Sequence, residues 1–239
     1  MKLDILAIGA HPDDVELGCA ATLAKEIASG KKVGIIDLTR GELGTRGTAE
    51  TRDREASEAA KILGITIREN MEFADGFFVN DKTHQLAIIK MLRKYKPEIV
   101  ICNAVDDRHI DHGKGSKLVS DACFLSGLMK IETTDIKGEL QGAWRPKQVY
   151  HYMQWKSLEP DFAVDVTGFM DKKMASVLAY QTQFYDKDSN EPETPISSKN
   201  FTDSIMYRAK DLGRLIGVEY AEGYNVERYV AVDSLFDLK

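Results

Sequence analysis

Along the first 130 residues of this chain, short apolar runs alternate with stretches in which apolar residues have the spacing of a helix. Four runs rich in Leu, Ile and Val have the length and the flanking turn residues of buried strands: residues 3–8, 32–38, 65–73 and 98–102. Between and after them, apolar residues recur three or four positions apart, as in amphipathic helices: residues 17–28, 50–63, 86–95 and 113–129. This alternation predicts strand–loop–helix units with parallel strands and right-handed crossovers.

The last hundred residues are less regular. Their patterns predict strands at 147–153, 162–166 and 228–232, helices at 169–184 and 201–216, and an exposed polar loop at 186–200. We therefore expect an α/β fold with a Rossmann-like, doubly wound, mostly parallel sheet and a smaller irregular C-terminal part. We expect one domain over residues 1–239, in which 1–130 form the core with the active site and 131–239 complete it.

The composition restricts the partners more than the fold. A net charge of −6 gives no electrostatic reason to expect nucleic acid or an anionic membrane as a partner. No signal-peptide pattern opens the chain and no apolar run reaches about 18 residues, so we expect a cytoplasmic protein without a membrane span. Three cysteines stand in apolar contexts, at Cys19, Cys102 and Cys123, which favours reduced structural thiols over a disulfide or a cysteine metal site.

A histidine and two carboxylates stand between the first predicted strand and the first helix. They belong to the stretch His11, Pro12, Asp13 and Asp14. The exit of the first strand is a place where α/β sheets bind ligands. Pro12 fixes one backbone angle and biases His11 towards an extended conformation, so this turn should be stiff. A stiff turn that presents imidazole and carboxylate groups suits the first shell of a metal centre.

A second stretch of this kind follows the fourth predicted strand, at residues 106–113. Because parallel strands end at the same sheet edge, His112 should approach His11 and Asp14. A catalytic zinc site takes three nitrogen or oxygen ligands and leaves one position open for water. We expect His11, Asp14 and His112 to be these ligands, with ferrous iron as an alternative to zinc. In the competing interpretation, His11 caps a helix or packs in the core, and the aspartates complement the helix dipole.

The neighbouring polar residues suggest further roles. Adjacent residues of a turn point in different directions, so Asp13 would act as a general base beside the metal rather than as a ligand; the alternative is a solvated turn charge. His109, expected to be protonated, would act as an acid or stabilise an oxyanion, unless it also binds the metal. Asp111 would be a carboxylate that orients a metal ligand or caps the helix, and not a catalyst.

Two arginines near these loops, Arg52 and Arg108, are candidates for binding an anionic group of the substrate. The alternative for both is a solvated position on the surface. A dinucleotide cofactor is disfavoured, because the glycine pattern Gly-x-Gly-x-x-Gly does not follow the first strand.

Together these motifs identify a family resemblance. His-Pro-Asp-Asp at 11–14, His-x-x-His at 109–112, Thr-Arg-Gly-Glu at 39–42 and the helix containing Arg52 resemble the zinc-dependent PIG-L/LmbE-like N-deacetylases, over roughly the first 130 residues. The resemblance implies a hydrolase that removes acetyl from an N-acetylglucosamine unit. It also implies His11, Asp14 and His112 as metal ligands, Asp13 as general base and His109 as electrostatic catalyst, matching the roles assigned above.

Within that family, the loop at 40–48 and the Tyr-Asp-Lys segment at 185–187 look most like the deacetylases of bacillithiol biosynthesis. Their substrate is N-acetylglucosaminyl malate, whose carboxylates would engage Arg52 and Arg108. The resemblance also implies a homo-oligomer, with a hexamer as the form suggested by similarity. The alternatives are a deacetylase of another N-acetyl sugar (a chitooligosaccharide or a mycothiol-type conjugate), a metal-dependent hydrolase of a different bond, and a non-catalytic binding module.

Overall fold

One mixed sheet of seven strands organises the structure, a computed structural model that describes residues 1–238. The strands are β1 Ile5–Gly9, β2 Val33–Asp37, β3 Ile67–Asn70, β4 Ile99–Cys102, β5 Gln148–Tyr152, β6 Phe162–Asp165 and β7 Ala221–Val226. They lie in the order β3, β2, β1, β4, β5, β7, β6. The first five strands pair in parallel, whereas β7 is antiparallel to both β5 and β6.

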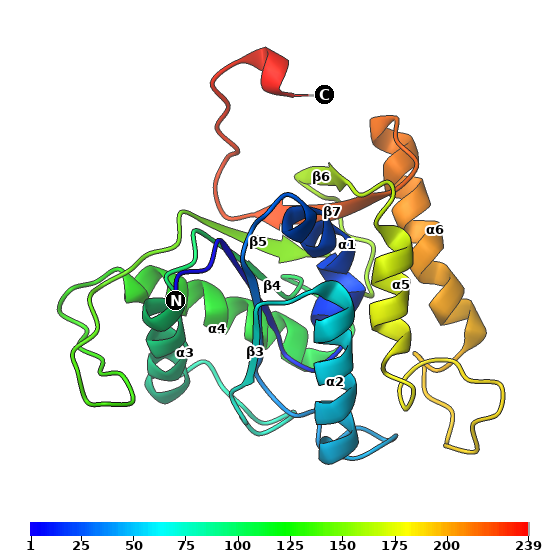
Figure 1. The fold of residues 1–239 in the computed structure, drawn as a ribbon, viewed down its shortest axis with the longest axis horizontal. Helices are drawn as coiled ribbons and strands as arrows, with labels where there is room; N and C mark the ends of the chain where they lie inside the picture. The colour runs from blue at the N-terminus through cyan, green and yellow to red at the C-terminus, as the bar shows by residue number, and fades with distance from the viewer. Residues whose placement is uncertain (239) are drawn as a thin grey trace.

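Helices cover both faces of this sheet (Figure 1). They are α1 Asp14–Ala28, α2 Ala49–Leu63, α3 Lys82–Tyr95, α4 Ile110–Ser126, α5 Met170–Leu178 and α6 Lys199–Ile216, followed by a short 3-10 helix, η1 Leu235–Asp237. Helices α3 and α4 pack together on one face, while α1, α2 and α5 pack together on the other, and α6 lies against β7. This arrangement confirms the predicted doubly wound α/β fold. Within the described residues, no helix combines the length and the hydrophobicity needed to cross a bilayer.

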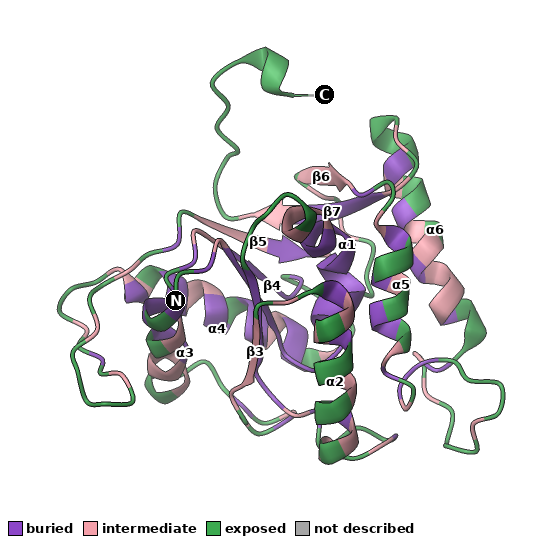
Figure 2. Ribbon diagram, in the orientation of Figure 1, coloured by how far each residue is buried: buried purple, intermediate pink, exposed green. Residues whose placement is uncertain are grey.

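The order of the strands explains the apolar patterns. Strands β1 and β4 are central, and side chains on both of their faces are removed from solvent, as Figure 2 shows. Ile8 and Cys102 pack with the residues of α3 and α4, whereas Ala7 and Ile101 pack with α1. A strand that is buried on both faces has no solvent-facing side for polar residues, which explains the continuous apolar run at 99–102.

Three elements differ from the sequence prediction. The closing strand is β7, and residues 228–232 lie outside the sheet and are exposed. The run of Tyr, Val, Ala and Val at 229–232 misled the prediction. The true strand, β7, buries Glu222, which forms an ion pair of 2.5 Å with Lys173. Helix α5 ends at Leu178 and turns replace its predicted continuation to residue 184. Helix α4 begins at Ile110, which places His112 in its first turn.

Candidate active site

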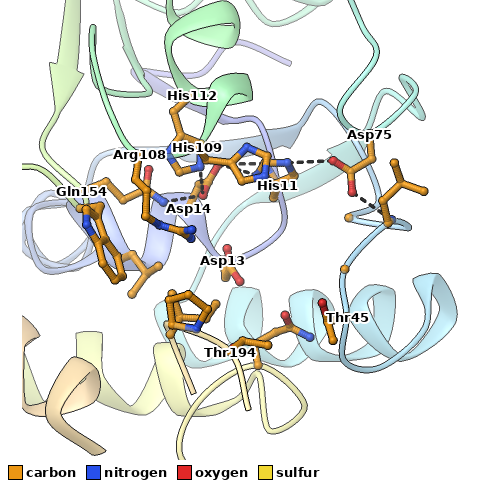
Figure 3. Close-up of a pocket in the computed structure, with 18 of the residues that line it drawn as sticks. His11, Asp13, Asp14, Thr45, Asp75, Arg108, His109, His112, Gln154 and Thr194 are labelled. Carbon is orange, nitrogen blue, oxygen red and sulfur yellow. Dashed lines mark hydrogen bonds and ion pairs between the residues drawn. The ribbon is translucent and has the colours of Figure 1, made fainter. Parts of the chain in front are cut away.

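The carboxyl ends of β1 to β5 surround a cavity of about 610 Å³ (Figure 3). Each loop that leaves one of these strands contributes side chains to the wall: His11 after β1, Leu43 after β2, Asp75 after β3, His109 after β4 and Gln154 after β5. Residues 193–196, in the predicted exposed loop before α6, close the opposite side. The two stretches that carry the histidines in the sequence therefore meet in one cavity.

Asp14 lies between two histidines at the base of this cavity. One of its carboxylate oxygens, Oδ2, is 3.5 Å from Nδ1 of His11, and the other, Oδ1, is 3.1 Å from Nε2 of His112. All three residues are buried. Two amides hold the carboxylate from behind: Asn103 Nδ2 donates to Oδ2 at 3.0 Å and Gln154 Nε2 donates to Oδ1 at 2.5 Å. The three predicted metal ligands are thus brought together.

The outward nitrogen of each of these histidines faces a carboxylate. Nε2 of His11 is 3.0 Å from Asp75, and Nδ1 of His112 is 2.6 Å from Asp107. A carboxylate accepts a hydrogen bond from the outward N–H of a neutral ring, which leaves the lone pair on the inward nitrogen; here the inward nitrogens face Asp14. Histidines that bind metals are held in this way. The donor set therefore fits a divalent metal ion at His11, Asp14 and His112.

The protonation of this cluster shows how strongly its charges interact. Burial alone would lower the pKa of His112, but the charge of Asp14 and the hydrogen bond to Asp107 raise it to about 9. Burial likewise opposes a charged Asp14, but the charge of His112 and the hydrogen bond from His11 hold its pKa well below the usual range. A metal ion would take the place of the imidazole protons as the positive partner of Asp14, because ligating histidines must be neutral.

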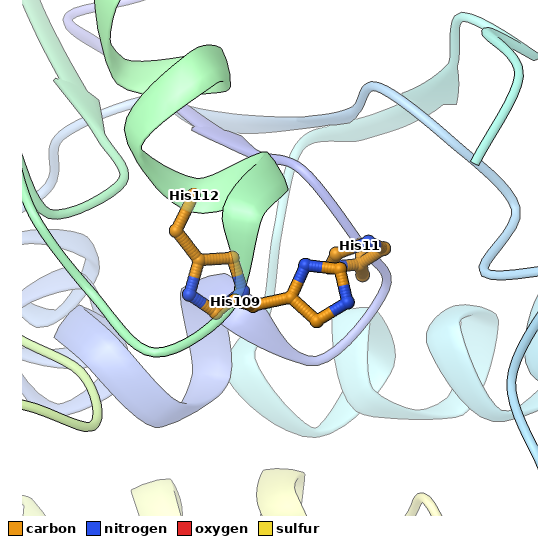
Figure 4. Close-up of side chains that lie close together, drawn as sticks. All are labelled: His11, His109 and His112. Atoms are coloured by element: carbon orange, nitrogen blue, oxygen red, sulfur yellow. The ribbon is translucent and has the colours of Figure 1, made fainter. Parts of the chain in front are cut away.

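His109 is the third histidine of the cluster (Figure 4), and its ring centroid is 4.5 Å from that of His11. Ligand atoms of His11, His109 and His112 lie close enough together to bind one ion. However, Nδ1 of His109 accepts a hydrogen bond of 3.2 Å from the backbone N–H of Asp111. An accepting Nδ1 places the proton of the neutral ring on Nε2, which then has no lone pair for a metal.

The same hydrogen bond corrects the predicted charge of His109. A protonated ring would direct a second N–H at the N–H of Asp111. Burial and the charges of His11 and His112 also lower the pKa of His109. The geometry therefore gives a neutral His109 with a free Nε2–H donor at the cavity, instead of the imidazolium expected from the sequence.

Asp13 occupies a strained position beside the predicted metal ligands. Its φ angle of 113° lies in the left-handed region, which is uncommon for a residue with a side chain. This conformation starts helix α1 and turns the carboxylate away from Asp14, so that Asp13 Oδ2 is 3.0 Å from the guanidinium of Arg52. Burial raises the pKa of Asp13 to about 7, although Arg52 opposes the shift. A carboxyl group with this pKa suits a general base near neutral pH.

The remaining predicted residues occupy different kinds of position. Arg52 is 4% exposed and lines the cavity, and its Nη2 donates to Asp13 and to the carbonyl of Pro12. Arg108 is exposed at the rim, with its guanidinium 4.7 Å above the ring of Trp155. Asp111 lies behind His11, 3.4 Å from Nε2, and also pairs with Lys114 at 2.6 Å.

Sequence analysis missed the residues that hold the cluster in place. Asp75, Asp107, Asn103 and Gln154 received no role in it. Asp107 was the easiest to find, because it stands in the same stretch as His109 and His112. The other three follow the ends of β3, β4 and β5, so their position at the site depends on strand order.

Asp107 gives a first testable prediction. The change Asp107→Asn removes the carboxylate that orients His112, and we expect the dissociation constant for the metal to rise by about 10–100-fold. Asp106→Asn is the matched control, because Asp106 is exposed and pairs only with Lys156, at 2.7 Å, within the described residues. Equilibrium competition with a metal-sensitive dye measures both. Equal metal affinity for the two variants would contradict the positioning role of Asp107.

Known proteins are similar to this chain in sequence and in fold. Residues 6–123, which contain both histidine stretches, match the family described as "PIG-L: GlcNAc-PI de-N-acetylase". A solved structure of a conserved protein from Thermus thermophilus is similar with a TM-score of 0.84 and 34% identity, over 98% of each chain. The diacetylchitobiose deacetylase of Thermococcus kodakarensis is 27% identical, over 92% of this chain and 81% of its own length.

A relative that is named for a different activity is the mycothiol S-conjugate amidase of Streptomyces coelicolor. It is 27% identical over 63% of this chain, and the match spans 60% of its own length. The extent of the family match and the nearly complete overlap with a 34% identical structure confirm the resemblance found in the sequence, and the chain belongs to the PIG-L family of de-N-acetylases.

Proposed function

We propose that the protein is a metal-dependent hydrolase that removes the N-acetyl group from N-acetylglucosaminyl malate, a step of bacillithiol biosynthesis. One observation carries the reaction class: Asp13, with its pKa near neutrality, faces the same cavity as the His11–Asp14–His112 cluster. A base and a metal site next to one another are what amide hydrolysis by water requires. The two relatives named for deacetylase and amidase activities support the same class.

The chemistry divides between the metal and the side chains. Zinc, or ferrous iron, held by His11, Asp14 and His112 would lower the pKa of a bound water and polarise the amide carbonyl. Asp13 takes a proton from the attacking water and passes it to the departing amine, so that acetate and a free glucosamine remain. The charge of Arg52 favours the ionised form of Asp13, because it opposes the effect of burial on the pKa of Asp13.

His109 contributes a hydrogen bond where negative charge develops. Its Nε2–H is directed by the bond that Nδ1 accepts from the start of α4. A neutral donor fixed in this way stabilises the carbonyl oxygen as it becomes an oxyanion, without having to titrate during the reaction. Loss of one such donor typically lowers kcat by about 10²–10³-fold.

The pH dependence of the reaction provides a second prediction. Because Asp13 must be ionised to act as a base, kcat/KM should fall as the pH drops below its pKa. The change Arg52→Gln removes the cation that opposes the raised pKa of Asp13, so the acidic limb should move to higher pH, by about one unit or more. Arg52→Lys keeps the charge and should move the limb less. An unchanged limb in Arg52→Gln would exclude Asp13 as the titrating base.

Arg108 is the residue that we propose for binding the malate carboxylates. It is exposed at the rim, its guanidinium lies over Trp155, and it has no ion-pair partner among residues 1–238. A guanidinium that is held by an aromatic ring and has free donors suits a planar carboxylate. Because Arg52 is occupied by Asp13, Arg108 is the stronger candidate of the two.

Release of acetate from three sugars tests the substrate. We expect N-acetylglucosaminyl malate to be preferred in kcat/KM over both N-acetylglucosamine and N,N'-diacetylchitobiose, and Arg108→Gln to lose most of this preference. The Arg108→Gln change should raise KM for N-acetylglucosaminyl malate and leave kcat nearly unchanged, because the carboxylate is remote from the reacting bond. Preference for N,N'-diacetylchitobiose would support the deacetylase reaction but contradict N-acetylglucosaminyl malate as the substrate. Acetate from none of the sugars would favour hydrolysis of a different bond.

A further inference from the structure

A second cavity, of about 530 Å³, lies between α6, β7 and the segment that follows β5. Most of its wall is apolar and includes Met153, Leu158, Pro160, Ile205, Leu212 and Leu215. Leu17 is the one residue that lines both this cavity and the active-site cavity among the described residues. The second cavity is therefore a neighbour of the active site and not a part of it.

Two aromatic rings contribute to the wall between the cavities. Trp155 and Phe201 both line the active-site cavity, and their rings stack with centroids 5.3 Å apart. Two residues after Trp155, Ser157 lines the second cavity, and one helical turn after Phe201, Ile205 does the same. The segment after β5 and helix α6 therefore each line the active-site cavity first and the second cavity a few residues later.

The charged groups of the second cavity are paired, with two exceptions. Lys173 forms an ion pair of 2.5 Å with Glu222 and donates to the carbonyl of Leu17 at 2.8 Å. Asp211 pairs with Arg214 at 2.8 Å. The side chain of Glu159 is exposed and makes no hydrogen bond within the described part of the chain.

Arg208 is the second exception. This half-buried guanidinium has no hydrogen-bond or ion-pair partner among residues 1–238. Burial lowers its pKa, and the charge of Asp107 on the active-site side opposes that shift. A cation that has lost part of its hydration without gaining a partner is costly to keep in a folded protein. An anion in the cavity would remove that cost.

We propose that this second cavity binds a small organic carboxylate, with its carboxylate group on Arg208 and its apolar body against the side chains around Met153 and Leu212. Arginine presents paired N–H donors that match a planar carboxylate. A largely apolar wall with a few polar groups is typical of sites for small ligands, and Arg208 is the unpaired cation of this wall among the described residues. The site does not depend on the deacetylase reaction, since it lies outside the catalytic cavity.

Binding of benzoate to the purified full-length protein tests this site, with benzamide as its neutral counterpart. Isothermal titration should give a dissociation constant on the order of 1 mM for benzoate and no measurable binding of benzamide. The change Arg208→Gln should weaken benzoate binding by about tenfold or more. Lys210→Gln removes an exposed charge from the same helix and should leave binding unchanged. Thermal unfolding establishes that each variant is folded, and Arg208→Lys should retain part of the affinity.

Several results would overturn the proposal. Benzoate binding that is unaffected by Arg208→Gln, or equal binding of benzamide, would remove Arg208 as the anchor. Loss of binding in Arg108→Gln but not in Arg208→Gln would place benzoate in the catalytic cavity. Absence of benzoate binding to the wild-type protein would overturn the proposal outright. The readout is binding, so none of these results bears on the proposed reaction.

Discussion

Asp13→Asn is expected to lower kcat by about 10³-fold while the protein stays folded and keeps its metal. General-base catalysis contributes about 10²–10⁴-fold, and the asparagine cannot accept the proton of the attacking water. Asparagine is the appropriate replacement, because it tolerates the left-handed backbone that Asp13 adopts at φ 113°. Its side chain can also still accept from Arg52.

Steady-state kinetics and metal analysis of the same sample separate the possible results. Asp13→Asn with normal metal content and much reduced kcat agrees with the base assignment. Asp13→Ala removes the acceptor for Arg52 as well and should be less stable, so it serves to distinguish lost chemistry from lost structure. Full turnover in Asp13→Asn would contradict the assignment.

His112→Gln is expected to abolish metal binding at stoichiometric concentrations and to reduce the rate by at least about a thousandfold. The change removes one of three protein ligands and with it the polarisation on which hydrolysis of an unreactive amide depends. Glutamine is preferred over alanine because it can still donate to Asp107, whose carboxylate accepts from His112 Nδ1 at 2.6 Å. That choice limits the destabilisation from an unpaired buried charge.

His84→Gln is the matched control for this experiment. His84 lies at the start of α3, where its Nδ1 is 2.8 Å from Asp81, and it does not line the active-site cavity. This variant should keep the metal content and rate of the wild-type protein. A His112→Gln protein that retains one metal per chain would show that another donor set holds the ion, such as His11 with Asp75 and Asp111.

The sequence was sufficient to predict the meeting of His11, Asp14 and His112. Parallel strands deliver their carboxyl ends to one edge of the sheet, so two polar stretches after β1 and β4 approach each other once these strands pair. Alternating apolar runs predicted those strands, and the two elements turned out to be neighbours. For this part of the site, the pairing of β1 with β4 was the one contact between distant segments that had to be correct.

Other parts depend on contacts that no local pattern reports. The neutral state of His109 follows from one backbone hydrogen bond at the start of α4. The pairing of Arg52 with Asp13 depends on where α2 packs, and the spacing of residues along the chain does not report it. Strand β7 buries Glu222 against Lys173 from α5, and a polar residue in a strand is interpreted from sequence as facing solvent.

Reconstitution with metal tests the central claim most directly. Protein freed of metal with a chelator would be titrated with Zn²⁺ or, without oxygen, with Fe²⁺, while acetate release from N-acetylglucosaminyl malate is measured. The account predicts no activity without metal, and a linear rise that ends at about one equivalent per chain, with no such rise in His112→Gln. Full acetate release by the metal-free protein, or activation that is the same in His112→Gln, would contradict a catalytic metal held by His11, Asp14 and His112.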